Sequence, residues 1–187
     1  MTEEKRRARP AAQYGPTAAA VAANVARLRG ARGWSIYALA AALERAGRAI
    51  TPSAIAKLEK QQRQVTVDDL AALAVVLKVS PASLLLPAVT SGDAEAAVTG
   101  GGTPKARDAW AWANGERPLR LTPGDESTEL LEFELYAMPP WRRDVWRHIE
   151  GVSRGAEVGP RALRQALDVV LADLDRDEGG TDGPSVD

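Results

Sequence analysis

The chain has 187 residues, no cysteine and a single histidine, His148. Without cysteine it has neither a disulfide framework nor a cysteine zinc site, and one histidine does not make a metal cluster, so the sequence predicts no cofactor. No apolar run approaches the roughly 20 residues needed to cross a membrane, and the first residues lack the apolar stretch of a secretion signal. We therefore expect a cytoplasmic protein that does not enter membranes.

Charge is distributed unequally along the chain. Residues 1–87 hold 13 Lys or Arg against 6 Asp or Glu, a net charge of +7, whereas residues 88–187 hold 11 against 19, a net charge of −8. A basic half joined to an acidic half is expected when one end of a protein meets a polyanion. The alternative is a neutral protein with two differently charged solvated surfaces.

The basic half is predicted to be a flexible arm followed by a compact all-α domain. Residues 1–15 are polar, hold four Lys or Arg and have no apolar period, so this basic arm either follows a DNA minor groove or remains a solvated tail. Residues 16–87 contain five helical segments with start and stop signals such as the N-cap Ser35 and the stop residues Gly33 and Gly47. The expected helices run over about 17–32, 36–46, 52–59, 66–77 and 82–86.

The acidic half is predicted to be a linker, a helical region and a tail. Residues 88–104 are small and polar and include Gly100-Gly101-Gly102, which predicts a flexible Gly-rich linker. Residues 105–177 are predicted to be an acidic helical region that serves dimerisation or partner binding, and residues 178–187 a disordered tail. The expected helices of this half run over about 105–114, 127–137, 141–149 and 160–176.

Two apolar features of the acidic half leave alternatives open. Four tryptophans between residues 110 and 146 suit a small core, a dimer contact or a ligand pocket, in that order of preference. One face of the last helix is lined by Leu163, Leu167, Val170, Leu171 and Leu174. This stripe is either an ordinary packing surface or the face that pairs two copies of the chain.

With these helices in place, residues 17–87 resemble the Cro/C1-type helix-turn-helix family, also called the Xre family of transcription regulators. The resemblance is spread over the whole domain and is carried by Leu28-Arg29, Gly33-Trp34-Ser35, Leu39-Ala40, Ser53-Ala54-Ile55-Ala56-Lys57-Leu58-Glu59, Val67, Leu70, Leu73-Ala74, Leu77, Val79-Ser80 and Leu84-Leu85. The layout further resembles regulators from actinobacteria, which have a stretch similar to Ala-Trp-Ala-Trp-Ala-Asn-Gly-Glu-Arg-Pro-Leu after the linker.

The resemblance implies that the third helix lies in the DNA major groove, with side chains near its N-terminus facing base edges. Lys57 is suited to donate to guanine O6 and N7, and Ser53 to bond either a donor or an acceptor. Backbone N–H groups at the start of the second helix suit a phosphate, and Arg48, Lys60 and Arg63 would contact further phosphates. The expected DNA-binding residues are Ser35, Ile36, Tyr37, Arg48, Thr51, Pro52, Ser53, Lys57, Lys60 and Arg63.

The resemblance also implies an internal ion pair between Arg29 and Glu59, which would lock the first helix to the third. Two departures from the family pattern bear on the third helix. The family usually has a glycine two residues after the glutamate, but this chain has Gln61, so the helix is expected to extend or to end less sharply. The segment from Glu44 to Ile50 is also longer than the usual turn, which leaves the packing of the second and third helices open.

We interpret the chain as a sequence-specific DNA-binding transcription regulator, expected to be a repressor that binds double-stranded DNA as a homodimer and is not an enzyme. An alternative is an antitoxin-like or partner-binding regulator whose acidic C-terminal half engages another protein. A third hypothesis is a repressor with a self-cleaving Ser/Lys peptidase domain. Lys105 is the only lysine after Lys78, and no strand-rich fold is predicted around it, so the enzyme hypothesis is the weakest.

Overall fold

The computed structural model describes residues 14–143 and 158–178, which form eight α-helices, one short 3-10 helix and no strand. The all-α class predicted from the sequence is therefore confirmed. The chain divides into two compact units, residues 1–110 and residues 111–187. Among the described residues, no helix combines the length and the apolar character that spanning a membrane requires.

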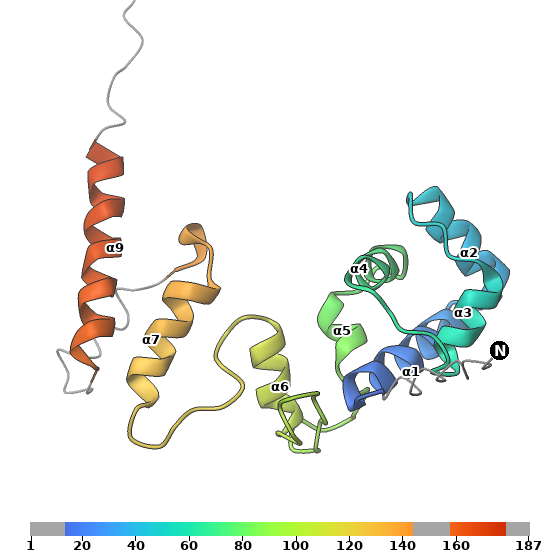
Figure 1. Cartoon of the computed structure of the whole chain (residues 1–187), viewed down its shortest axis with the longest axis horizontal. Coiled ribbons are helices and arrows are strands. Elements are labelled where there is room, and N and C mark those ends of the chain that lie inside the picture. The colour runs from blue at the N-terminus through green and yellow to red at the C-terminus, as the bar shows by residue number, and fades with distance from the viewer. Residues whose placement is uncertain (1–13, 144–157, 179–187) are drawn as a thin grey trace, which may run out of the picture. The chain divides into compact units, whose positions relative to one another are not determined.

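Five helices of the first unit pack around one apolar core, with α1 against α3 and α5, α2 against α3 and α4, and α4 against α5 (Figure 1). Each lies within one residue of its expected bounds. They are α1 (Pro16–Ala31), α2 (Ile36–Arg45), α3 (Pro52–Glu59), α4 (Val67–Val76) and α5 (Pro81–Leu85). The core consists mainly of leucine, valine and isoleucine, and each such side chain stabilises the fold by about 1.5–3 kcal/mol when fully buried.

Hydroxyl groups cap the starts of α2 to α5. Ser35, Thr51 and Ser80 each accept a hydrogen bond from the backbone N–H three residues later. At the start of α4, Thr66 and Asp69 form a capping box, in which each side chain bonds the backbone of the other residue. A cap of this kind contributes about 1 kcal/mol, so the short helices α3 and α5 depend on theirs.

The helices α1 to α4 end in the same turn, in which a residue with positive φ follows the last helical turn. At the ends of α1 and α2 this residue is Gly33 (φ 64°) and Gly47 (φ 81°), the two stop residues predicted from the sequence. At the ends of α3 and α4 it is Gln61 (φ 58°) and Lys78 (φ 49°). The turn at Gln61 closes with two backbone hydrogen bonds of 2.9 and 2.7 Å to the last turn of α3. The expectation that α3 extends or ends less sharply is therefore wrong.

Residues 88–104 contain a short hairpin rather than the flexible linker expected from their composition. The backbone N–H groups of Ala96 and Val98 each donate across this hairpin over 2.8 Å, and both side chains are buried. Gly100 and Gly102 have φ angles of 77° and 72°. The glycine run thus supplies the positive φ angles of a tight turn. The sequence predicted flexibility rather than a hairpin because only two small residues, Ala96 and Val98, alternate toward the core, which is a weak strand pattern.

The hairpin packs against the start of α1. The backbone N–H of Thr99 donates to Oγ1 of Thr17 over 2.9 Å, and the N–H of Thr17 donates to Oγ1 of Thr99 over 3.3 Å. A Cβ atom on Gly15 would lie 2.5 Å from Oγ1 of Thr99, so this close approach requires glycine. Gly15, which was expected in the basic arm, is therefore part of the folded first unit.

A buried amide fastens α1 to the end of α5. Asn24 is 2% exposed and its Nδ2 donates to the carbonyl oxygens of Leu84 and Leu86 over 3.1 and 2.7 Å. A buried amide left without partners costs about 1–3 kcal/mol, so these two bonds fix which carbonyls α1 must meet. This role of Asn24 was not predicted from the sequence.

In the second unit, α7 (Glu126–Ala137) packs against α9 (Pro160–Glu178). Their small core joins Leu131 and Leu135 to Ala162, Ala166 and Val170. The apolar stripe predicted on the last helix is divided by this packing. Val170 is 8% exposed, whereas Leu167 and Leu171 are 45% and 58% exposed.

The described tryptophans do not build the core of the second unit, which was the preferred expectation for them. Trp141 is 82% exposed and lies in the 3-10 helix η1 (Pro140–Arg142), while Trp110 and Trp112 are half-buried in α6 (Ala106–Ala113). Several predicted features lie outside the described residues, namely the arm at 1–13, most of the helix at 141–149 including Trp146, and the tail from 179.

Candidate nucleic-acid interface

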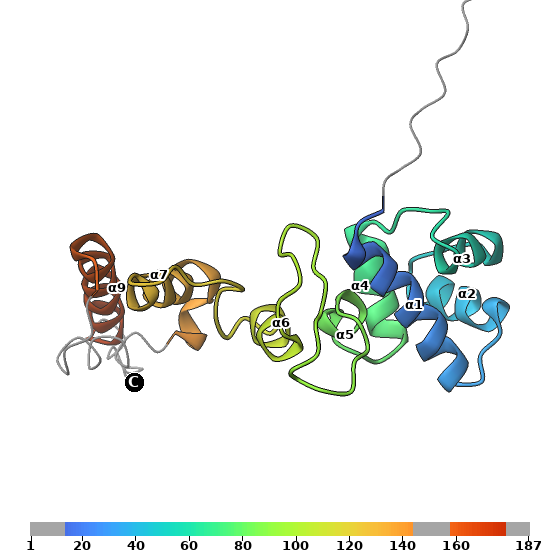
Figure 2. The same ribbon diagram turned by 90° about the horizontal axis from the view of Figure 1, so that it is seen from below.

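The helix α3 lies at the edge of the first unit, next to α2 (Figures 1 and 2). Its inner side is narrow, because only Ile55 and Leu58 are buried. Ser53 and Lys57 are exposed on the outside, and Thr51 is exposed at the N-terminus, where its hydroxyl accepts the capping hydrogen bond. A helix that is anchored by two buried side chains and has small side chains on its outer side can approach a DNA groove closely.

The ion pair between Arg29 and Glu59 that the resemblance implies is present. Nε and Nη2 of Arg29 donate to the two carboxylate oxygens of Glu59 over 2.6 and 2.9 Å, and Nη1 donates to the carbonyl of Trp34 over 2.8 Å. Hydrogen bonding to Glu59 raises the pKa of the Arg29 guanidinium. Glu59 is the only acidic residue of α3, and its side chain is 12% exposed. The outer side of α3 therefore carries no acidic group.

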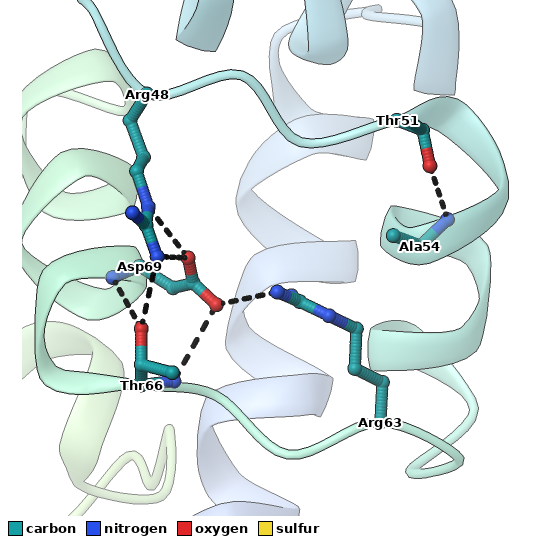
Figure 3. A network of polar contacts seen from close by, with 6 residues as sticks. All are labelled: Arg48, Thr51, Ala54, Arg63, Thr66 and Asp69. Carbon is teal, nitrogen blue, oxygen red and sulfur yellow. Dashed lines mark hydrogen bonds and ion pairs between the residues drawn. The ribbon is translucent and has the colours of Figure 1, made fainter.

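A second carboxylate, the buried Asp69, pairs with two partly exposed arginines (Figure 3). Its side chain is fully buried, with Oδ1 2.9 Å from Nη2 of Arg48 and Oδ2 2.8 Å from Nη2 of Arg63. Burial by itself would raise the pKa of Asp69. Hydrogen bonds from Arg48 and from the backbone of Thr66, with the positive charge of Arg63, nevertheless hold this pKa below its usual value.

The structure pairs Arg48 and Arg63, both expected to contact phosphates, with a carboxylate of the chain itself. Both guanidinium groups turn toward Asp69, and Nη1 of Arg63 is buried without a hydrogen-bond partner among the described residues. The physical reason is that a buried carboxylate lies within reach, and a charge-assisted bond inside the protein is stronger than one in water. These two residues therefore hold the segment before α3 and the segment after it onto α4.

The start of α2 offers backbone donors. Ser35 is exposed, and its hydroxyl accepts the capping hydrogen bond. The backbone N–H groups of Ile36 and Tyr37 lie in the first helical turn, where the helix itself supplies no carbonyl to accept their hydrogen bonds. The side chain of Ile36 packs against the core, whereas that of Tyr37 is 75% exposed. Trp34 also packs against the core.

The other seven expected DNA-binding residues separate into two groups. Thr51, Ser53, Lys57 and Lys60 are exposed on α3 or at its ends, and Pro52 is half-buried in its first turn. Arg48 and Arg63 pair with Asp69, with 40% and 30% of their side chains exposed. The role of Asp69 as the shared partner of Arg48 and Arg63 was not predicted from the sequence. Arg48 and Arg63 lie 21 and 6 residues before Asp69 in the chain, and no local pattern in the sequence indicates that both reach the same carboxylate.

Lys105, the lysine considered for peptidase chemistry, lies on the hairpin. Its ammonium is 3.4 Å from Oδ1 of Asp93, and both side chains are exposed. Asp93 also accepts a hydrogen bond from Arg107. Lys105 is thus exposed and paired with a carboxylate, whereas a lysine that activates a serine is desolvated.

The order of these elements, a capped short helix α2 followed by an exposed and capped α3 within five helices, defines a DNA-binding helix-turn-helix domain. A protein-family model described as Helix-turn-helix matches residues 25–84, which run from the middle of α1 into α5. Residues 25–84 are a Cro/C1-type helix-turn-helix domain, the DNA-binding domain of Xre-family transcription regulators. A search of curated proteins and a search of solved structures gave no match.

Proposed function

We propose that the chain is a sequence-specific transcription repressor that reads the DNA major groove with α3. The observation that carries this proposal is the charge of the outer side of α3. Lys57 and Lys60 are exposed there, while the only acid of the helix, Glu59, is turned inward onto Arg29. A polyanion would thus meet cations and small side chains without meeting an unpaired carboxylate.

The contacts divide into positioning and reading. Lys60 and the backbone donors at the start of α2 would bind phosphates and set the register of the domain on DNA. Lys57 would donate to guanine O6 and N7, and Ser53 would bond a base edge of either kind. Direct reading by so few side chains is modest, so DNA shape and the pairing of two copies would supply the remaining specificity.

The second unit supports pairing of two copies. Packing of α9 on α7 leaves Leu167 and Leu171 exposed one turn apart. Two copies that buried these side chains against each other would place two reading helices on one DNA, as two-fold related half-sites require. Light scattering in solution tests this step. We expect a dimer whose mass halves on Leu167→Glu with Leu171→Glu, whereas the control Arg164→Glu, exposed on the same helix, leaves it unchanged. A monomeric wild-type chain would favour a different protein as the partner of the acidic half.

Selection of bound fragments from genomic DNA tests the proposed function itself. The wild-type chain should enrich a small set of related sites, bind them tightly and lose affinity steeply as salt rises, because phosphate contacts release counterions. A chain that binds only weakly and without sequence preference would contradict the proposal. Repression is then tested by placing an enriched site at a promoter and measuring transcription with and without the protein.

A further inference from the structure

A pocket of about 380 Å³ lies in the first unit, apart from the outer side of α3. It is an open pocket lined by the start of α1, the loop between α3 and α4, the first turns of α4, the end of α5 and the turn of the hairpin. Pockets that bind small molecules span about 300–1,000 Å³, so this one has room for a small organic molecule. Its lining residues are Tyr14, Gly15, Thr17, Ala18, Val21, Gln64, Val65, Thr66, Val67, Leu70, Leu85 and Thr99.

The residues that line the pocket disfavour a charged ligand. None of the lining residues is charged, and Ala18, Val21, Val65, Leu70 and Leu85 give the wall an apolar character. An ion placed here would lose water without gaining a counter-charge, which is costly, whereas an apolar molecule would gain about 25 cal/mol for each Å² of apolar surface it buries.

The polar groups of the wall are few and differ in availability. The hydroxyls of Thr17 and Thr99 accept hydrogen bonds from each other's backbone, and that of Thr66 caps α4 and accepts a bond from Arg48. The Tyr14 hydroxyl and the Gln64 amide remain as groups that can hydrogen-bond a ligand. Specificity in such a pocket comes from one or two polar groups of this kind in an apolar surround.

We propose that this pocket is a binding site for a small, uncharged and mainly apolar molecule that carries one neutral hydrogen-bonding group. The inference goes beyond DNA binding and does not depend on it. The hairpin supplies one wall of the pocket through Thr99. This segment would therefore form part of the binding site in addition to connecting the two units. At the rim, Val67 is 84% exposed, and a bound molecule would cover part of it.

Titration of the isotope-labelled full-length chain with 2-naphthol, followed by NMR, tests the proposal. We expect saturable shifts of the resonances of Ala18, Val21, Leu70 and Leu85. The carboxylate analogue 2-naphthoate should bind at least tenfold more weakly at the same pH, because the wall offers no cation. Ala18→Leu, which fills the pocket from α1, should weaken 2-naphthol binding at least tenfold.

Matched variants keep the test decisive. Ala23→Leu adds the same side chain at an exposed position of α1 and should leave binding unchanged. Val65→Phe fills the pocket from the opposite wall and replaces Ala18→Leu if that variant lowers the melting temperature. Absence of saturable shifts, equal binding of naphthol and naphthoate, or equal binding by the filled and control variants would each overturn the proposal. Nuclear Overhauser contacts between residues 1–13 and the pocket, with no binding of 2-naphthol, would overturn it by making the chain's own N-terminal segment the occupant.

Discussion

The inner and outer sides of the region around α3 use cationic side chains in opposite ways. On the inner side, Arg29 meets Glu59, and Arg48 and Arg63 meet Asp69, so three guanidinium groups are held by two carboxylates with little or no exposure. On the outer side, Lys57 and Lys60 are exposed. The difference teaches that a basic residue near α3 is paired or left exposed according to whether a carboxylate lies within its reach, and not according to its position in the chain.

Loss of the interior carboxylate should give the largest effect on stability. Asp69→Asn leaves Arg48 and Arg63 without a counter-charge and should destabilise the first unit by about 3 kcal/mol, since breaking a buried ion pair costs about 3–5 kcal/mol and both arginines are partly exposed. Urea unfolding followed by circular dichroism measures the change. A destabilisation below about 1 kcal/mol would show that the interior network is not what holds α4 to the segments around α3.

The same carboxylate predicts a pH dependence. The pKa of Asp69 is lowered in the folded chain, so its contribution is complete above the unfolded pKa of about 3.9 and is lost as pH falls through the lower folded value. The difference in unfolding free energy between the wild type and Asp69→Asn should be constant from about pH 5 to 7 and should shrink below about pH 4. A difference that shrinks between pH 5 and 7 would contradict an ionised Asp69 with a lowered pKa.

Two matched neutralisations separate the inner side from the outer side. Arg63→Gln should destabilise the fold by about 2 kcal/mol, because it removes one partner of a buried carboxylate. Lys60→Gln should change stability by less than about 0.5 kcal/mol. It should weaken binding to all DNA sequences and reduce the steepness of the fall of log binding constant with log salt concentration by about 1. Lys105→Gln, on the hairpin, controls for the change in net charge. Equal stability of the Arg63 and Lys60 variants would erase the distinction between the two sides.

The end of α3 predicts a smaller, stabilising change. Gln61 holds φ 58°, a conformation that costs a side chain about 1 kcal/mol and costs glycine little. Gln61→Gly should therefore stabilise the first unit by about 1 kcal/mol and raise its melting temperature by about 4–8 °C. Gly47→Ala, at the equivalent turn after α2, should lower it by a similar amount. A loss of stability in Gln61→Gly would show that the glutamine side chain makes a compensating contact.

Local signals in the sequence predicted the helices of the first unit, because the N-caps Ser35 and Thr51 and the stops Gly33 and Gly47 act within one turn of chain. The ion pair of Arg29 with Glu59 followed from the family resemblance. The hairpin was missed because the glycine composition of residues 88–104 suits both a flexible chain and a tight turn. The pairing of Arg48 and Arg63 with Asp69 was not predicted for a different reason, since it forms only when α4 packs against α2 and brings Asp69 beside both arginines. Exposure of the leucines on α9 likewise depends on which side α7 covers.

The ratio of affinity for an enriched genomic site to affinity for unrelated DNA, measured for the wild type and for Lys57→Ala, tests the central claim most directly. If α3 reads bases, Lys57→Ala should lower this ratio about tenfold or more, corresponding to about 1–3 kcal/mol, while the Lys60 variant lowers both affinities alike and leaves the ratio unchanged. A wild-type ratio near one, or a ratio that Lys57→Ala does not change, would contradict base reading by α3.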